Sequence, residues 1–143
     1  MGAGPKRGCS SRGFALISLD TTFLIDLQRE MRGPGVGPAS QWMKENEVAC
    51  GVSAICIGEL VEGLPNPDHP VLDYFLHRFV FLPVDRAVAT SYGKLVKGLR
   101  AKGQLIGTND LWIAATALAQ GVPLLTRNIQ ELGRVPGLRL MTY

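Results

Sequence analysis

Five short apolar runs, separated by segments with helical spacing, constrain this chain more than any other feature of its sequence. The runs predicted to be strands are FALISL (14–19), VACGVS (48–53), FVFLPV (79–84), VPLLT (122–126) and LRLMT (138–142). Strands buried on both faces of a parallel sheet are continuously apolar, whereas half-exposed strands alternate with polar residues. The pattern therefore predicts an α/β fold with a central parallel sheet of about five strands covered by helices on both faces.

The segments between the runs have the spacing and end signals of helices. Helices are expected over residues 21–32, 39–46, 54–63, 71–77, 86–103 and 109–121, with a helical turn over 128–132. Ser53 and Asp85 stand at N-cap positions, and Gly121 ends a helix. In the first helix, Met31 is expected on the apolar face and Asp26 on the opposite, polar face.

The charges divide the chain into a basic tail and a neutral body. Its 143 residues carry 15 Lys and Arg against 12 Asp and Glu, a net charge of +3. Lys6, Arg7 and Arg12 all lie within residues 1–13, which contain no acid, so residues 14–143 are formally neutral. We therefore expect a flexible basic tail over 1–13 and one domain over 14–143. A neutral body excludes a uniformly basic coat for nucleic acid.

No segment has the length and hydropathy of a membrane span or a secretion signal. The chain has three cysteines, and Cys50 and Cys56 lie inside apolar stretches, where a free cysteine acts as a small hydrophobic residue. We expect a reduced, cytoplasmic protein that does not enter a membrane.

Polar side chains occur where the predicted strands end. Asp20 follows the first run, Thr126 and Asn128 flank the end of the fourth, and Asp110 lies in the first turn of a helix that begins at the same edge. Glu59 lies within the helix after the second run. Ligands of open α/β sheets bind at the carboxyl ends of the strands. Clustered carboxylates repel unless a cation neutralises them, and oxygen ligands suit Mg²⁺ or Mn²⁺.

Each of these residues also has an ordinary structural explanation. Asp20 and Asn128 could simply cap helices, and Asp110 would favour the dipole at a helix N-terminus. Glu59 is harder to explain in this way, because its helix is apolar on most sides and a carboxylate there needs a partner. The hypothesis of a site depends on the convergence of four segments, and no single residue carries it.

Contact with a nucleic acid requires positive charge near this edge. Lys94, Lys97, Arg100 and Lys102 form a run without an intervening acid, in which Lys97 and Arg100 are three residues apart. This run is either an RNA-facing stripe or an ordinary solvated face. Arg127, beside the candidate site, is better placed for a phosphate contact.

Four segments, in this order and spacing, carry a family resemblance. LISLDTTFLID, SAICIGELVEG, TNDLWIAATALAQG and PLLTRNIQELGRVPGLRL resemble the PIN-domain ribonucleases, and most of all the VapC-type toxins of prokaryotic toxin–antitoxin pairs. The resemblance covers residues 15–143. It implies a three-layer α/β/α fold and a ribonuclease, a hydrolase that cleaves RNA phosphodiester bonds with Mg²⁺, for which Mn²⁺ can substitute.

Carried over by position, the resemblance makes Asp20, Glu59 and Asp110 the catalytic acids, with Asp20 and Asp110 holding the metal. Asn128 stands at the fourth acidic position of the family, and Thr126 is a supporting hydroxyl beside the site. Because an amide supplies an oxygen without a charge, we expect one firmly held metal ion and a second that arrives with the substrate.

The resemblance also implies partners: an RNA substrate, a second copy in a homodimer, and a cognate antitoxin that inserts a C-terminal segment into the site. Residues 23–31 and 54–64 could form a groove for such a segment or could be ordinary core. Two alternatives stay open, a housekeeping PIN-domain nuclease of RNA processing and a non-catalytic regulatory or protein-binding α/β module. An aspartyl-phosphate phosphatase is disfavoured, because Asp20 is followed by Thr-Thr-Phe and no strand-end motif supplies a lysine.

Overall fold

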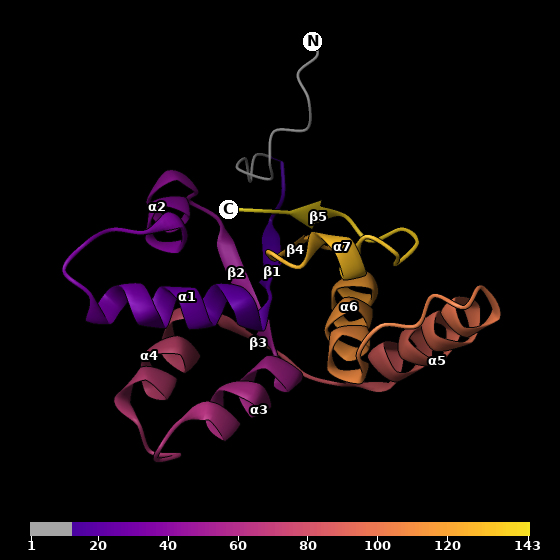
Figure 1. Ribbon diagram of the computed structural model, residues 1–143, viewed down its shortest axis with the longest axis horizontal. Coiled ribbons are helices and arrows are strands. Elements are labelled where there is room, and N and C mark those ends of the chain that lie inside the picture. The colour runs from indigo at the N-terminus through magenta and orange to yellow at the C-terminus, as the bar shows by residue number, and fades with distance from the viewer. Residues whose placement is uncertain (1–12) are drawn as a thin grey trace, which may run out of the picture.

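The computed structural model describes residues 13–143 (Figure 1), so the expectation of a tail over 1–13 falls almost wholly outside it. The five strands are β1 (Leu16–Leu19), β2 (Ala49–Ser53), β3 (Val80–Leu82), β4 (Leu124–Leu125) and β5 (Leu140–Met141). They form a sheet of order β3-β2-β1-β4-β5 in which every neighbouring pair is parallel. The predicted parallel five-stranded sheet is confirmed.

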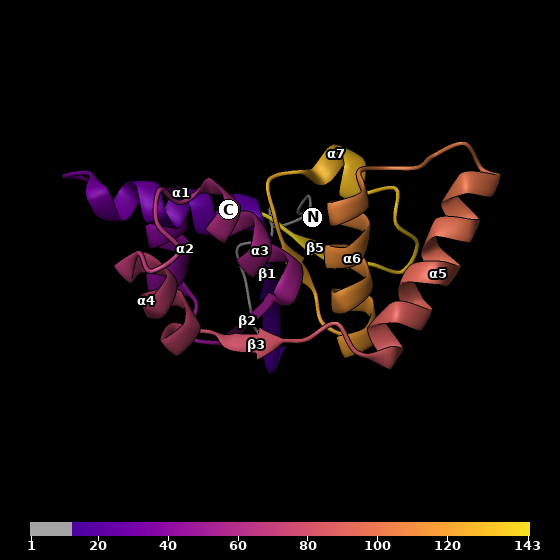
Figure 2. The same ribbon diagram turned by 90° about the horizontal axis from the view of Figure 1, so that it is seen from below.

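The helices occupy the two faces of this sheet. They are α1 (Thr21–Arg32), α2 (Pro38–Glu45), α3 (Ala54–Gly63), α4 (Pro70–Arg78), α5 (Arg86–Ala101), α6 (Thr108–Gln120) and α7 (Ile129–Leu132). Figures 1 and 2 show α1, α2 and α4 on one side and α5, α6 and α7 on the other, which makes three layers. Helix α3 contacts both α1 and α6. None of the helices in residues 13–143 has the length and apolar character needed to cross a bilayer.

Several helix ends follow the sequence signals. The side chain of Ser53 accepts a hydrogen bond from the backbone of Cys56, and Asp85 accepts one from Val88. Gly121 ends α6 with φ = 68°, in the left-handed region that glycine adopts without steric cost. These three predicted ends are confirmed, and they fix where each helix begins or ends relative to the sheet.

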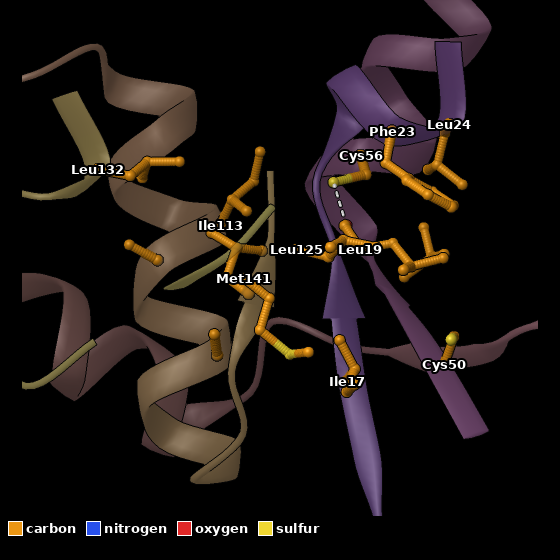
Figure 3. Packing of buried hydrophobic residues seen from close by; sticks show 14 of the residues in the cluster. Ile17, Leu19, Phe23, Leu24, Cys50, Cys56, Ile113, Leu125, Leu132 and Met141 are labelled. Carbon is orange, nitrogen blue, oxygen red and sulfur yellow. Dashed lines mark hydrogen bonds between the residues drawn. The ribbon is translucent and has the colours of Figure 1, made fainter. Parts of the chain in front are cut away.

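The core is continuous through the sheet. Ile17 and Leu19 of β1 and Leu125 of β4 are fully buried, and Figure 3 shows them between the helices of the two faces. Cys56 donates a hydrogen bond to the backbone oxygen of Leu19 (Figure 3). Burial raises the pKa of the Cys50 thiol to about 11 and that of Cys56 to about 12, so both are protonated at neutral pH.

Each helical layer also contains an aromatic pair. Trp42 of α2 meets Phe23 of α1 edge to face, with 5.8 Å between ring centroids. Across the sheet, Tyr92 of α5 stacks on Trp112 of α6 at 3.6 Å with an angle of 6° between the rings. These pairs help to hold α2 against α1 and α5 against α6.

Two residues of α1 contradict the predicted amphipathic pattern. Met31 is 49% exposed, whereas Asp26 is only 8% exposed. Asp26 does not face solvent because Arg127 and Tyr143, which lie more than 100 residues later, cover its carboxylate. Local periodicity cannot register contacts of this kind.

Candidate functional site

Asp20 is the single residue between β1 and α1, and it is almost completely buried, with 2% exposure. Its Oδ2 accepts hydrogen bonds from the hydroxyls of Thr126 at 2.6 Å and Thr22 at 3.2 Å. Its Oδ1 accepts from the backbone N–H of Thr21 at 2.8 Å, so Asp20 is also the N-cap of α1. The carboxylate is thus fixed by three uncharged donors.

Glu59 lies half-buried on α3 and points its carboxylate toward the same edge. Its Oε1 accepts a hydrogen bond from the hydroxyl of Thr21 at 2.5 Å, and its Oε2 accepts from the side-chain amide of Asn109 at 3.1 Å. Because Thr21 follows Asp20 and Asn109 precedes Asp110, Glu59 is linked to the immediate neighbours of both other acids.

Asp110 lies half-buried in the first turn of α6. Its Oδ2 accepts a hydrogen bond from the side-chain amide of Asn128 at 3.1 Å. The pKa of Asp110 is raised to about 6, mainly by burial and then by the negative charges of Asp20, Glu131 and Glu59, while the hydrogen bond from Asn128 lowers it by a smaller amount. The neighbouring carboxylates are therefore close enough to repel one another.

The pKa of Asp20 is raised as well, mainly by burial, with a smaller contribution from Glu59. The three hydrogen bonds to its carboxylate oppose this shift. In the described residues no Lys, Arg or His forms an ion pair with any of these acids, since the ion pairs found there all involve Asp26. Within residues 13–143, the negative charge of the site is therefore not balanced by an ion pair.

This donor set fits a hard divalent cation. Mg²⁺ is usually bound by one or two carboxylates together with water and substrate phosphate. Asp20 and Asp110 fit that description, and the raised pKa of each is the signature of carboxylates that a cation would stabilise. Over residues 13–143 there is no group of three or more His, Cys, Asp or Glu side chains arranged to hold a metal ion by themselves. A bound cation would thus keep much of its hydration.

Asn128 and Thr126 join these acids into one hydrogen-bonded set. The hydroxyl of Thr126, fully buried, donates to Asp20 and accepts from the backbone N–H of Asn128 at 2.9 Å. Asn128 stands at the N-cap position of α7, but its side chain makes no capping hydrogen bond and turns to Asp110 instead.

Sequence reasoning missed three participants: Thr21, Asn109 and Glu131. Thr21 and Asn109 orient Glu59, and Glu131 adds negative charge near Asp110 while accepting a weak hydrogen bond from Asn128 at 3.4 Å. Glu131 follows Asn128 by three residues, which is a spacing that brings side chains together on a helical turn. That spacing was the sequence feature from which the role of Glu131 could have been predicted.

The candidate RNA-contacting residues are arranged differently. Lys97 and Arg100 are exposed on α5, which lies beyond α6 when viewed from the sheet (Figure 2). Arg127 is adjacent to the site, but its guanidinium pairs with Asp26, with 2.8 Å between Nε and Oδ2.

The chain combines a five-stranded parallel sheet with a cluster of carboxylates at the carboxyl edge of the strands. Residues 17–138 match the family described as the PIN domain, so the chain belongs to the PIN-domain family. Within that family it is similar to proteins named ribonuclease VapC. Ribonuclease VapC2 of Rickettsia felis is 36% identical over 105 residues, covering 70% of this chain and 77% of that protein. Ribonuclease VapC4 of Mycobacterium tuberculosis is 31% identical over 130 residues, covering 86% and 93%.

Solved structures agree with this placement. The crystal structure of VapBC2 from Rickettsia felis, bound to a DNA fragment from its promoter, matches with a TM-score of 0.76 and 28% identity, covering 90% of this chain and 98% of that one. The structure of VapBC-1 from nontypeable Haemophilus influenzae matches with a TM-score of 0.69 and 25% identity, covering 89% and 97%.

Proposed function

We propose that this chain is a VapC-type ribonuclease, the toxin of a toxin–antitoxin pair, which hydrolyses RNA with a divalent cation and is neutralised by a cognate antitoxin. One observation carries the chemistry: Asp20, Glu59 and Asp110 come from three elements to one sheet edge, surrounded by uncharged donors. The ribonuclease activity is supported by the curated relatives named ribonuclease VapC, and the antitoxin by the similar VapBC complexes.

The roles of the acids follow from how each is held. Asp20 and Asp110 would hold Mg²⁺, or Mn²⁺ in its place, because burial raises the pKa of both and a cation would stabilise their charged forms. A divalent cation bound there polarises a phosphate oxygen and lowers the pKa of bound water. Glu59, kept in place by Thr21 and Asn109, orients the attacking water. Asn128 orients Asp110 without adding charge, which favours one firmly held ion and a second that enters with RNA.

Cleavage of RNA by the purified protein tests this proposal. We expect degradation of total RNA with Mg²⁺, arrest by EDTA, and loss of activity in Asp20→Asn and Asp110→Asn. Asp68→Asn is the matched control, because it removes the same charge from a residue that is exposed in the loop between α3 and α4. Full activity of Asp20→Asn in a nuclease-free preparation would show that the reaction occurs elsewhere.

A toxin is distinguished from a housekeeping nuclease by growth. A toxin arrests the cell that expresses it, and coexpression of the protein encoded beside it restores growth. Growth that is unaffected by expression of an active nuclease would favour the RNA-processing alternative, and an absence of any cleavage would favour the non-catalytic module.

A surface hollow beside Glu59 supports the presence of a binding site for the antitoxin. It has a volume of about 260 Å³ and lies between α1 and α3, in the two segments expected to form a groove. Its wall includes Ile25 and Leu60, with Arg29 and Arg32 on its α1 side. An antitoxin segment with apolar side chains and neighbouring acidic residues would complement this surface, and a basic side chain could reach Glu59.

The homodimer and the cytoplasmic location are also part of the proposal. Val80 and Phe81 of the edge strand β3 are 49% and 52% exposed, and Tyr74 and Leu76 of the adjacent α4 are 46% and 43% exposed. Exposed apolar side chains on an edge strand and on the helix beside it favour burial against a second copy. Light scattering of the purified protein at micromolar concentration, with Phe81→Lys as the disrupting variant, tests it, and a monomeric wild type would refute it.

A further inference from the structure

A second polar cluster lies on α1, one residue away in sequence from Thr126 and Asn128 through Arg127, and the proposed chemistry does not use it. Asp26 is buried on α1, and its Oδ2 accepts a hydrogen bond from the Tyr143 hydroxyl at 2.6 Å. The same carboxylate pairs with Arg127, at 2.8 Å from Nε to Oδ2 and 3.2 Å from Nη2 to Oδ1. We call Asp26, Arg127 and Tyr143 the Asp26 cluster.

The guanidinium of Arg127 engages both carboxylate oxygens through two of its nitrogens. This fork geometry fixes orientation as well as distance, and a lysine ammonium cannot reproduce it. The positive charge of Arg127 is also paired within the protein, because the Asp26 carboxylate lies at hydrogen-bonding distance. The Arg127 side chain is 56% exposed, so the pairing fixes the orientation of the guanidinium at Asp26 while part of it stays in contact with solvent.

Tyr143, two residues after the end of β5, completes the cluster. Its ring packs edge to face on Phe23 with 4.9 Å between centroids, which places the hydroxyl over Asp26. Burial and the adjacent Asp26 raise the pKa of Tyr143, so that its hydroxyl remains a donor at neutral pH. The buried carboxylate is therefore paired with the Tyr143 phenol and the Arg127 guanidinium, and more weakly with Arg29 of its own helix at 3.4 Å.

Arg127 occupies the middle of the segment that organises the active acids. The residue before it, Thr126, donates to Asp20, and the residue after it, Asn128, donates to Asp110. A shift of this three-residue segment would displace both hydrogen bonds at once. Two contacts tie the segment to α1: the Arg127 guanidinium pairs with Asp26, and the Arg127 backbone N–H donates a weak hydrogen bond to the Thr22 hydroxyl at 3.5 Å.

We propose that Asp26, Arg127 and Tyr143 are positioning residues that lock residues 126–128 onto α1 and thereby set the orientation of Asp20 and Asp110. This role rests on the proposed function, since it assigns the cluster to RNA cleavage. It gives Arg127 a task different from the phosphate contact expected from sequence, and the two roles differ in what they predict for kcat and for KM.

The test compares Arg127→Lys, Arg127→Gln and Tyr143→Phe with a charge-loss control, Arg86→Gln, on the exposed first turn of α5. Asp26→Asn is a fourth variant that keeps the shape of the buried side chain. Steady-state cleavage of a fluorogenic oligoribonucleotide gives kcat, KM and the dependence of KM on salt. Two-dimensional NMR of the metal-free protein without RNA follows the backbone and side-chain amide signals of Asn128.

A positioning role predicts that Arg127→Lys and Arg127→Gln both lower kcat by about 10- to 100-fold with KM and its salt dependence unchanged, the range found when groups that orient active residues are removed. The Asn128 signals shift in both, and Tyr143→Phe produces a smaller change in the same direction. Arg86→Gln matches the wild type. A change in kcat that follows the shift of the Asn128 signals across the variants supports the positioning role of the Asp26 cluster.

A phosphate contact gives the opposite pattern and overturns the proposal. Arg127→Gln would then raise KM and reduce its salt dependence by roughly one phosphate contact, with kcat preserved. Arg127→Lys would restore most of the affinity. If the wild type cleaves no RNA, the proposed function fails, and the NMR comparison alone decides: unchanged Asn128 signals in all four variants refute the lock.

Discussion

Asp110→Asn is expected to make the metal-free protein more stable while it abolishes cleavage. The folded chain holds Asp110 half-buried near three other carboxylates, and its pKa rises to about 6 from an ordinary value of 3.8. This difference corresponds to at most about 3 kcal/mol of unfavourable ionisation at neutral pH. Because the side chain is partly exposed, solvent screening reduces the gain to about 1–2 kcal/mol. An asparagine carbonyl can still accept the hydrogen bond from Asn128.

The gain depends on pH in a defined direction. A carboxyl whose pKa is raised by folding binds more protons in the folded state between pH 3.8 and about pH 6, so wild-type stability falls as pH rises through that window. The Asp110→Asn variant does not lose stability in this window, because its amide does not ionise. Its advantage is therefore absent near pH 4, grows up to about pH 6 and then stays constant.

Urea unfolding in EDTA, monitored by circular dichroism at several pH values, measures this difference. Asp68→Asn serves as the control and is expected to change stability little at any pH. An Asp110→Asn variant that is no more stable than the wild type at about pH 7.5, or whose advantage does not shrink toward about pH 4, would falsify the electrostatic account. Saturating Mg²⁺ should reverse the order, because a ligand of the folded state stabilises only the protein that binds it.

Three further outcomes are expected. Thr126→Val removes a buried hydroxyl that donates to Asp20 and should lower the free energy of unfolding by about 1.5–3 kcal/mol in urea titrations; Thr126→Ser should retain most of it, and equal losses would contradict the role of the hydroxyl. Gly37→Ala places a methyl group against the Glu30 side chain, which caps α2 by accepting hydrogen bonds from Ser40. The substitution should lower the free energy of unfolding by about 1–2 kcal/mol, and a loss of less than about 0.3 kcal/mol would contradict the capping role of Glu30. Arg32→Glu should weaken the affinity for the antitoxin by about tenfold, the equivalent of about 1.4 kcal/mol, as measured by calorimetry. Unchanged affinity would exclude the hollow between α1 and α3 as the antitoxin binding site.

Much of the fold was predictable because its signals are local. Each strand is an apolar run bounded by polar or breaking residues, and caps such as Ser53 and Asp85 lie directly at the helix starts. The rule that parallel strands present their carboxyl ends at one edge then places Asp20, Asp110 and Thr126 together without any knowledge of distances.

The contacts that orient these residues were beyond sequence reasoning. Thr21 and Asn109 are ordinary polar residues of helix starts, and their role depends on meeting Glu59, which is 38 and 50 residues away. Asp26 was assigned to a solvated face because helical periodicity ignores the covering Arg127 and Tyr143. In both cases the deciding interaction joins segments whose relative positions only the folded chain determines.

The aromatic pairs of the two layers give the molecule a built-in optical readout. The chain has two tryptophans, and each lies in a different layer: Trp42 against Phe23 on the α1–α2 side and Trp112 against Tyr92 on the α5–α6 side. Replacing one of them by phenylalanine leaves an emission signal from a single layer. Loss of structure around α6, which carries Asp110, can therefore be followed separately from loss of structure around α1, which follows Asp20.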